Sequence, residues 1–345
     1  MYRWLSREFT TVECTRTCEE RIVYNRQSIH VEAATTNREI VANHLAYTHL
    51  YMFLVAAVME KQKGKAGYYV LSVVPLLATL MIQVLSGLTC SVIGTVVYSV
   101  RIAMNGEAEL LNDPAALQAA VTDYIMQFII YAVVVAQILT LIGAAVWYGI
   151  LVKRKNVNRP IKECVNVRTV LMCILAGIGL QLVIDFLLNI AALAFPNVME
   201  AYSQLVETVG IGETTWISLL ATVILAPISE ELLFRGLTLR FLRSAGVKFA
   251  AANVIQALFF GILHMNLVQG IYAFAVGLVL GYVAGKCRTV FLPILLHLCF
   301  NIAGTVLAAL LSGNTGWLMQ GILTVAGVLM LTGAFLLVQK EMKNL

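Results

Sequence analysis

Eight apolar runs, separated by charged loops, constrain the fold of this chain more than any other feature of its sequence. Most of them have the length of about 20 residues that an α-helix needs to cross the hydrocarbon core of a bilayer. Backbone polar groups in lipid must be satisfied internally, and a helix does this within one segment. The runs occupy about residues 68–100, 122–152, 169–195, 214–236, 249–265, 270–285, 289–311 and 317–338.

The composition also indicates a membrane environment. Hydrophobic residues make up 60% of the 345 residues and charged residues only 12%, whereas a soluble domain is roughly 25% charged. Lipid must therefore solvate most of the folded chain. We predict an all-α, polytopic transmembrane helix bundle of about eight spans, in which the runs at 249–265 and 270–285 are short for spans.

The charges of the loops predict the topology. Basic residues gather in alternate loops, at 153–162, 240–248 and 286–288, whereas the loops between them are acidic or neutral. By the positive-inside rule, the basic loops and both termini lie in the cytoplasm. Basic residues confined to short loops do not form a nucleic-acid groove. We therefore expect a multi-pass protein of the cell membrane, in contact with the lipid bilayer and not with nucleic acid.

Three parts of the chain differ in character. Residues 1–60 are mostly polar and predict an N-terminal arm that ends in an interfacial helix near 41–59. Residues 61–165 contain two transmembrane spans, and residues 166–345 contain the remaining spans. The polar side chains that stand out within apolar runs are concentrated in the third part.

The fourth run carries three ionisable residues, Glu230, Glu231 and Arg235, just after Pro227. A charged residue inside a span costs about 2.5–3.5 kcal/mol on insertion scales, so it indicates function. Glu231 and Arg235 are four residues apart and can pair on one helical face, whereas Glu230 is offset by about 100°. Pro227 frees a backbone carbonyl one turn upstream. We predict a structural Glu231–Arg235 ion pair and a Glu230 that is free to hold or deprotonate a water.

Two other runs contribute histidines and an amide. His264 ends the fifth run, and His297 and Asn301 lie four residues apart in the seventh. His297 and Asn301 share a helical face and could present two donors to one oxyanion. At about 1.5 Å per residue, the three sets could meet at a common depth, but His264 would require the fifth helix to tilt.

These residues also carry a resemblance. Glu230-Glu231-x-x-x-Arg235, Phe260-x-x-x-His264 and His297-x-x-x-Asn301 resemble, in order, the three motifs of the CAAX-protease and bacteriocin-processing (CPBP, or Abi) family of intramembrane peptidases. The resemblance covers about residues 170–310. It implies a catalytic domain over 166–345 whose site opens to the cytoplasmic side. It also implies that Glu230 and His264 position the attacking water, that His297 and Asn301 stabilise the oxyanion, and that Glu231 and Arg235 support the site.

The function that the resemblance implies is intramembrane proteolysis. The substrate would be a membrane-associated or lipidated peptide or protein, as in CAAX-type processing, bacteriocin or peptide processing, or self-immunity. Glu230, His264 and His297 could bind zinc and leave a fourth position for water. They lie on separate helices, however, without a His-Glu-x-x-His motif. A metalloprotease and a metal-free glutamate protease therefore both stay open, as does the oligomeric state.

Two alternative functions use the same residues. Carboxylates and histidines within a membrane also form proton relays, which would suit a proton-coupled transporter. Transporters commonly have repeated halves with paired broken helices, and the sequence shows neither. A non-catalytic membrane scaffold is the other alternative, but a scaffold has no need for an unpaired Glu230.

Two further patterns predict helix contacts. Asp185 lies on one stripe with Gln181 and Asn189, which predicts a polar seam between helices rather than a partner for Arg235. The small residues of Gly277-x-x-x-Gly281-x-x-x-Gly285 predict a close-packing face, either for a helix beside the site or for a dimer contact.

Overall fold

A computed structural model describes residues 64–105, 113–155, 161–208, 215–310 and 316–343, all of which belong to one compact unit, His49–Leu345. These residues are helical, and no strand occurs among them. The prediction of an all-α membrane bundle is therefore confirmed. The arm and the interfacial helix predicted within residues 1–60 lie outside the described residues.

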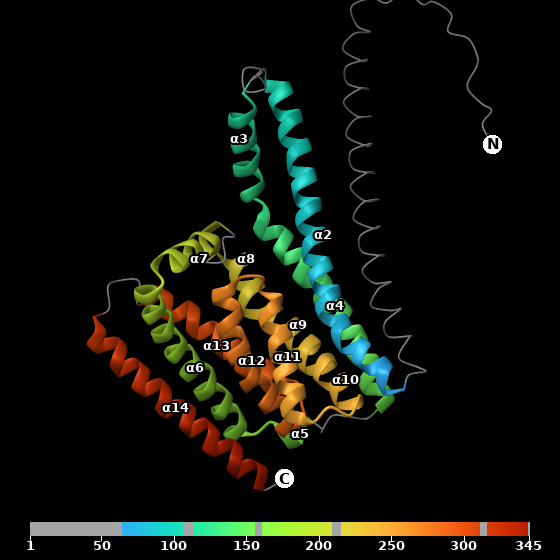
Figure 1. Cartoon of the computed structure of the whole chain (residues 1–345), viewed down its shortest axis with the longest axis vertical. Helices are drawn as coiled ribbons and strands as arrows, with labels where there is room; N and C mark the ends of the chain where they lie inside the picture. Colours follow the sequence, from blue (N-terminus) through green and yellow to red (C-terminus); the bar gives the residue numbers. More distant parts are fainter. Residues whose placement is uncertain (1–63, 106–112, 156–160, 209–214, 311–315, 344–345) are drawn as a thin grey trace, which may run out of the picture. The chain divides into compact units, whose positions relative to one another are not determined.

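Seven helices within the described ranges are long and apolar enough to cross a membrane. They are α2, α4, α6, the continuous stretch from α8 to α10, α12, α13 and α14. The remaining apolar run forms α11, whose 15 residues span only about 22 Å. The helices (Figure 1) are α2 (Lys65–Asn105), α3 (Pro114–Met126), α4 (Ile129–Lys155), α5 (Ile161–Cys164), α6 (Val167–Ala194), α7 (Pro196–Thr208), α8 (Trp216–Leu219), π-helical η3 (Leu220–Leu225), α9 (Ala226–Glu231), π-helical η4 (Leu232–Thr238), α10 (Leu239–Ser244), α11 (Phe249–Leu263), α12 (Leu267–Cys287), α13 (Phe291–Leu310) and α14 (Trp317–Lys343).

Local signals in the sequence set the helix ends near the site. Asn166 accepts from the backbone N–H of Thr169, which makes a capping box at the start of α6. Asn266 likewise caps α12 by accepting from the N–H of Gln269 at 2.7 Å. Between α11 and α12, Met265 adopts a φ of 51°, a left-handed conformation that reverses the chain within a short turn. The two helices therefore form a hairpin with His264 at its tip.

Glycines bring this hairpin together. A Cβ on Gly281 of α12 would collide with the side-chain amides of Asn253 and Gln256 on α11, and one on Gly277 would lie 3.1 Å from the Cα of Ala257. Small residues allow such a close approach of helix backbones in membranes. The close-packing face predicted on α12 is thus confirmed, and α11 is the helix that packs on it.

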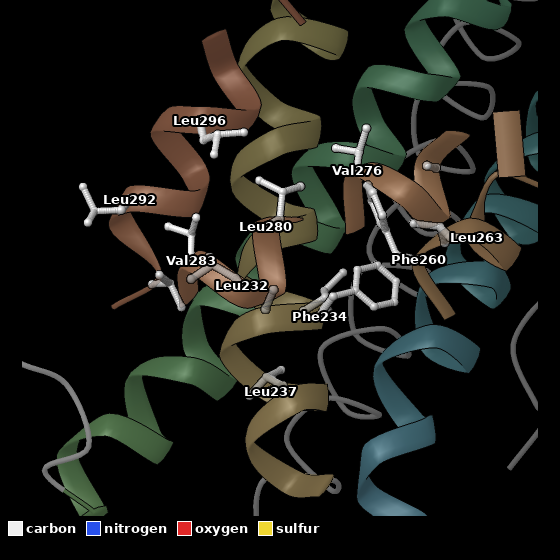
Figure 2. Packing of buried hydrophobic residues seen from close by; sticks show 14 of the residues in the cluster. Leu232, Phe234, Leu237, Phe260, Leu263, Val276, Leu280, Val283, Leu292 and Leu296 are labelled. Atoms are coloured by element: carbon white, nitrogen blue, oxygen red, sulfur yellow. The ribbon is translucent and has the colours of Figure 1, made fainter. Parts of the chain in front are cut away.

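The apolar core includes parts of α2, α4, α6 and α14, and its part nearest the site lies between the second half of α12, the first half of α13 and the segment η4. Figure 2 shows side chains from these three elements pointing toward one another. Phe260 of α11 extends this core, because its ring contacts that of Phe234 with 5.4 Å between centroids. The labelled members that are at most 8% exposed are Leu232, Phe234, Leu237, Phe260, Leu263, Val276, Leu280, Val283, Leu292 and Leu296.

The basic loops meet at one end of the bundle. Arg240 of α10 donates to the Tyr148 hydroxyl of α4 at 3.3 Å, and Gln339 of α14 donates to the Tyr282 hydroxyl of α12 at 3.1 Å. We call this the basic end, and the end where α6 stops and α8 and α12 begin the opposite end. The described basic residues of the basic end are Lys65, Lys162, Arg168, Arg240, Arg243, Lys248, Lys286, Arg288 and Lys340.

Candidate functional site

The helix that carries Glu230 and Glu231 is interrupted on both sides of them by π-helical turns, η3 and η4. Such turns are rare and occur frequently at functional sites. In the π register, the Thr222 carbonyl would accept from the residue five positions on, which is Pro227 and has no N–H. The Asn301 side chain donates to this carbonyl instead, at 2.7 Å. The predicted free carbonyl therefore exists, and it orients Asn301.

Glu231 is the centre of a buried charged cluster. Its Oε1 accepts from Arg235 Nη1 at 2.7 Å and lies 2.9 Å from His297 Nδ1. Glu231 is 0% exposed and Arg235 is 1% exposed. The predicted Glu231–Arg235 pair is therefore present, and His297 is a third member that the sequence did not indicate.

Arg235 also contacts two neighbouring helices, α11 and α12. Its Nη2 donates to the Gly277 carbonyl at 3.2 Å, and its guanidinium lies 4.5 Å from the centre of the Phe260 ring. Gln256 of α11 donates to the same Gly277 carbonyl at 2.9 Å. Sequence reasoning missed Gln256, although a fully buried amide in an apolar run is itself a signal of a specific partner.

Phe260 joins the two histidines of the site. Its ring meets the His264 ring edge-on with 5.1 Å between centroids, and the His297 ring edge-on at 5.7 Å. His264 therefore belongs to the same cluster, although the depth estimate made it the outlier. Among the described residues, no hydrogen bond or ion pair joins His264 to Glu230.

The contacts of the histidines assign their protons. His264 Nδ1 lies 2.9 Å from the Phe260 carbonyl, which can only accept, so Nδ1 carries a proton and Nε2 is free. His297 Nδ1 faces the Glu231 carboxylate in the same way, and its Nε2 lies 3.9 Å from Glu230 Oε2. His297 can donate from Nε2 only as an imidazolium.

Glu230 is placed differently from Glu231. It is 8% exposed, and the one ion-pair contact that it makes within 4 Å among the described residues is with His297 Nε2, at 3.9 Å from its Oε2. It takes no part in the Glu231–Arg235 pair. The position of Glu230 agrees with the prediction of a carboxylate left available, whereas its role in catalysis stays a prediction.

The proposed zinc ligands do not gather in this arrangement. In the described part of the chain, no group of three His, Cys, Asp or Glu side chains is placed to hold a metal ion. Glu230, His264 and His297 as they stand therefore do not fit a three-ligand metal site. Zinc stays a prediction, which a chelator experiment tests.

The stripe around Asp185 forms the predicted seam. Gln181 donates to Asp185 Oδ1 at 2.7 Å, and Asn189 donates to its backbone carbonyl at 2.8 Å. Gln181 also lies against α13, since a Cβ on Gly304 would be 3.2 Å from its amide. Arg235, whose hydrogen-bond partners are Glu231 and Gly277, does not use Asp185.

The comparison with known proteins falls on this cluster. Residues 212–303 match the family described as "Type II CAAX prenyl endopeptidase Rce1-like". The matched segment contains all three motifs, from Glu230 to Asn301, and the match confirms the resemblance drawn from them. Comparisons with curated proteins and with solved structures gave no significant match.

Proposed function

We propose that this protein, whose residues 212–303 carry the Rce1-like endopeptidase domain, is an intramembrane endopeptidase that hydrolyses a peptide bond with a carboxylate-activated water. One observation carries the proposal. A buried Glu230 lies 3.9 Å from His297 Nε2, next to a Glu231 that Arg235 already compensates. The Glu231–Arg235 ion pair is complete without Glu230, so Glu230 is available to act on a water.

The proposed mechanism begins with a water that bridges Glu230 and His264. His264 Nε2 is free to accept a hydrogen bond from it, because Nδ1 is committed to the Phe260 carbonyl. Glu230 takes a proton as the water oxygen attacks the substrate carbonyl, and later gives this proton to the leaving amine. General base and acid catalysis by one group in this way contributes typically 10²–10⁴-fold.

His297 and Asn301 are proposed to stabilise the tetrahedral oxyanion. Asn301 uses one amide N–H on the Thr222 carbonyl and has a second to donate. His297 donates from Nε2 as an imidazolium, whose Nδ1–H is held by Glu231 at 2.9 Å. Glu231 and Arg235 act through His297 and do not touch the substrate.

The proposed substrate is a membrane-associated or lipidated peptide or protein, and both termini of the chain are proposed to be cytoplasmic. Supporting observations are the buried position of the site within an apolar bundle and the gathering of basic residues at one end. A soluble peptide would have to leave water to reach Glu230, whereas a lipid-anchored one is already concentrated at the membrane.

The test compares wild type, Glu230→Gln and Asp185→Asn in membranes that contain a quenched, lipid-linked peptide. Glu230→Gln should lower cleavage by about 10²–10⁴-fold, while Asp185→Asn, which changes another intramembrane carboxylate, should cleave at the wild-type rate. The three proteins should unfold at similar temperatures. Equal cleavage by wild type and Glu230→Gln would remove the proposal.

A chelator separates the two forms of the mechanism. Loss of cleavage that zinc restores would support a metalloenzyme, and the geometry of the site would then have to change on metal binding. Cleavage that is indifferent to the chelator supports the glutamate mechanism proposed here. The wild-type protein serves for both arms.

A further inference from the structure

The α11–α12 hairpin turns at membrane depth. Its first helix, α11, starts at the basic end directly after Lys248, and its length of about 22 Å is less than the roughly 30 Å of a bilayer's hydrocarbon core. At the tip, Met265 and Leu267 are 67% and 72% exposed, as side chains that face lipid are. Lipid offers no hydrogen-bond partner to the backbone of this turn, so the protein itself has to supply one.

The last turn of α11 is tightened. The N–H of His264 donates to the Gly261 carbonyl at 3.2 Å, and that of Met265 donates to the Ile262 carbonyl at 3.1 Å. Both bonds span three residues rather than the four of a regular α-helix. In a regular helix the Phe260 carbonyl would accept from the His264 N–H, but here it lies 2.9 Å from Nδ1 of the His264 ring. The tightened turn therefore presents a backbone carbonyl to the ring.

This contact sets the tautomer of His264. A neutral imidazole carries one ring proton, and the Phe260 carbonyl can only accept, so the proton lies on Nδ1 and Nε2 is bare. In the proposed mechanism, that bare Nε2 accepts a hydrogen bond from the attacking water. The other tautomer would present a donor to the water instead. The conformation of the last turn of α11 is thus part of the chemistry of His264.

Asn266 holds the tightened turn. One N–H of its amide donates to the His264 carbonyl at 3.1 Å, and the other donates to Gln269 Oε1 at 3.0 Å. Its Oδ1 accepts from the backbone N–H of Gln269 at 2.7 Å, as the N-cap of α12. Both amide protons and the amide oxygen are therefore engaged. Beside Asn266, Met265 keeps a φ of 51°, which a residue other than glycine adopts only when its surroundings impose it.

A second asparagine in the bundle caps a helix away from the site. Asn166 caps α6 by accepting from the backbone N–H groups of Arg168 and Thr169 at 3.0 and 3.1 Å. Helix α6 carries none of the residues of the proposed site. Serine and aspartate also cap helices well, but neither has an amide that donates two hydrogen bonds. The bond to the His264 carbonyl is therefore a second task of Asn266, and capping alone does not require it.

We infer that Asn266 is a positioning residue of the proposed site, because its amide holds the end of α11 in the conformation that leaves His264 Nε2 bare for the water. This inference rests on the proposed function and adds to it a residue that acts through His264. Asn266 lies outside the three motifs that carry the family resemblance. Without its amide, the His264 carbonyl would be an unpaired acceptor at membrane depth, and the turn would rearrange to pair it.

NMR of the histidine rings tests the inference without any substrate. Wild type, Asn266→Ser and Asn166→Ser are labelled with heavy nitrogen in their histidine rings, and the His264 signals are assigned by their loss in His264→Gln. Serine keeps a capping oxygen at both positions. At alkaline pH, where imidazoles are neutral, wild type and Asn166→Ser should show a protonated Nδ1 and a bare Nε2. Asn266→Ser should show a mixture of the two tautomers.

Cleavage of the lipid-linked peptide gives the second readout. Asn266→Ser should lower kcat by about 10- to 100-fold, with a smaller change in KM, whereas Asn166→Ser should keep the wild-type kcat. If Asn266→Ser does not fold, Asn266→Asp replaces it, since aspartate has the same shape and no N–H to donate. A wild-type tautomer or a wild-type kcat in the Asn266 variant would overturn the inference, as would a mixture of tautomers in Asn166→Ser.

The two proposals can fail separately. If Glu230→Gln cleaves like wild type, the peptidase proposal falls, and the tautomer alone decides whether Asn266 positions His264. If Glu230→Gln is inactive while Asn266→Ser has the tautomer and the kcat of wild type, the peptidase proposal stands and Asn266 is a helix cap only.

Discussion

Two helix pairs in this bundle use glycine to approach closely, and they fill the contact differently. In the α6–α14 pair, a Cβ on Gly179 would lie 2.8 Å from the Gly327 carbonyl oxygen, so backbone meets backbone. In the α11–α12 pair, Gly281 faces the amides of Asn253 and Gln256. The first contact is packing alone, whereas the second makes room for polar groups.

Hydrogen bonds connect the polar α11–α12 contact to the site. Gln256 and Arg235 both donate to the Gly277 carbonyl, and Arg235 pairs with Glu231. Glu231 in turn holds His297 at 2.9 Å. A change in the α11–α12 contact should therefore alter catalysis, whereas a change in the α6–α14 contact should alter stability only. Four substitutions, ordered by their expected effect on stability, test this difference.

Glu231→Gln should have the largest effect. It leaves the buried Arg235 without a counter-charge, which costs about 3–5 kcal/mol, and it should abolish cleavage because His297 loses its acceptor. Unfolding in detergent and cleavage of the lipid-linked peptide measure the two effects. Adding Arg235→Met to the same protein should restore much of the stability but not the cleavage. If Glu231→Gln alone is as stable as wild type, the Glu231–Arg235 pair does not support the site.

Gly281→Ala should have the second-largest effect on stability. The new methyl displaces two buried amides, and overpacking together with a lost hydrogen bond costs about 2–4 kcal/mol. The cleavage rate per folded molecule should also fall, because the Gly277 carbonyl loses its Gln256 donor. Adding Asn253→Ala removes part of the clash and should recover stability. An unchanged rate in the folded fraction would contradict the link between this contact and the site.

Gly179→Ala is the matched change in the other pair. Its methyl would press on the α14 backbone and should destabilise the protein by about 1–3 kcal/mol. Cleavage per folded molecule should stay at the wild-type level, since no polar group of the site lies at this contact. The comparison of the two pairs breaks down if Gly179→Ala slows cleavage as much as Gly281→Ala does.

Pro227→Ala should change stability least, by about 1 kcal/mol or less in either direction. It supplies an N–H that competes with Asn301 for the Thr222 carbonyl, and so it should release the amide that Asn301 presents. Displacement of a reacting group by about 1 Å can cost about 10²-fold in rate. Steady-state kinetics should show a lower kcat with a smaller change in KM. Wild-type kinetics would mean that the freed carbonyl does not position Asn301.

The sequence by itself determined the features that depend on neighbouring residues. An apolar run of about 20 residues predicts a helix in lipid, because lipid offers no hydrogen-bond partner to backbone polar groups and a helix pairs them internally. Seven of the runs form helices that are long enough to span a membrane. The Glu231–Arg235 pair and the Gln181–Asp185 contact are both four residues apart. Helical geometry alone places such pairs on one face.

Only the tertiary structure decided which distant groups meet. The contact of Glu231 with His297 and that of Asn301 with Thr222 join different helices, and no local period encodes them. The contact of the Phe260 ring on α11 with the His297 ring on α13 also joins different helices. Every residue from 229 to 239 is buried because neighbouring helices surround this segment, and burial of this kind is a property of packing rather than of any one segment.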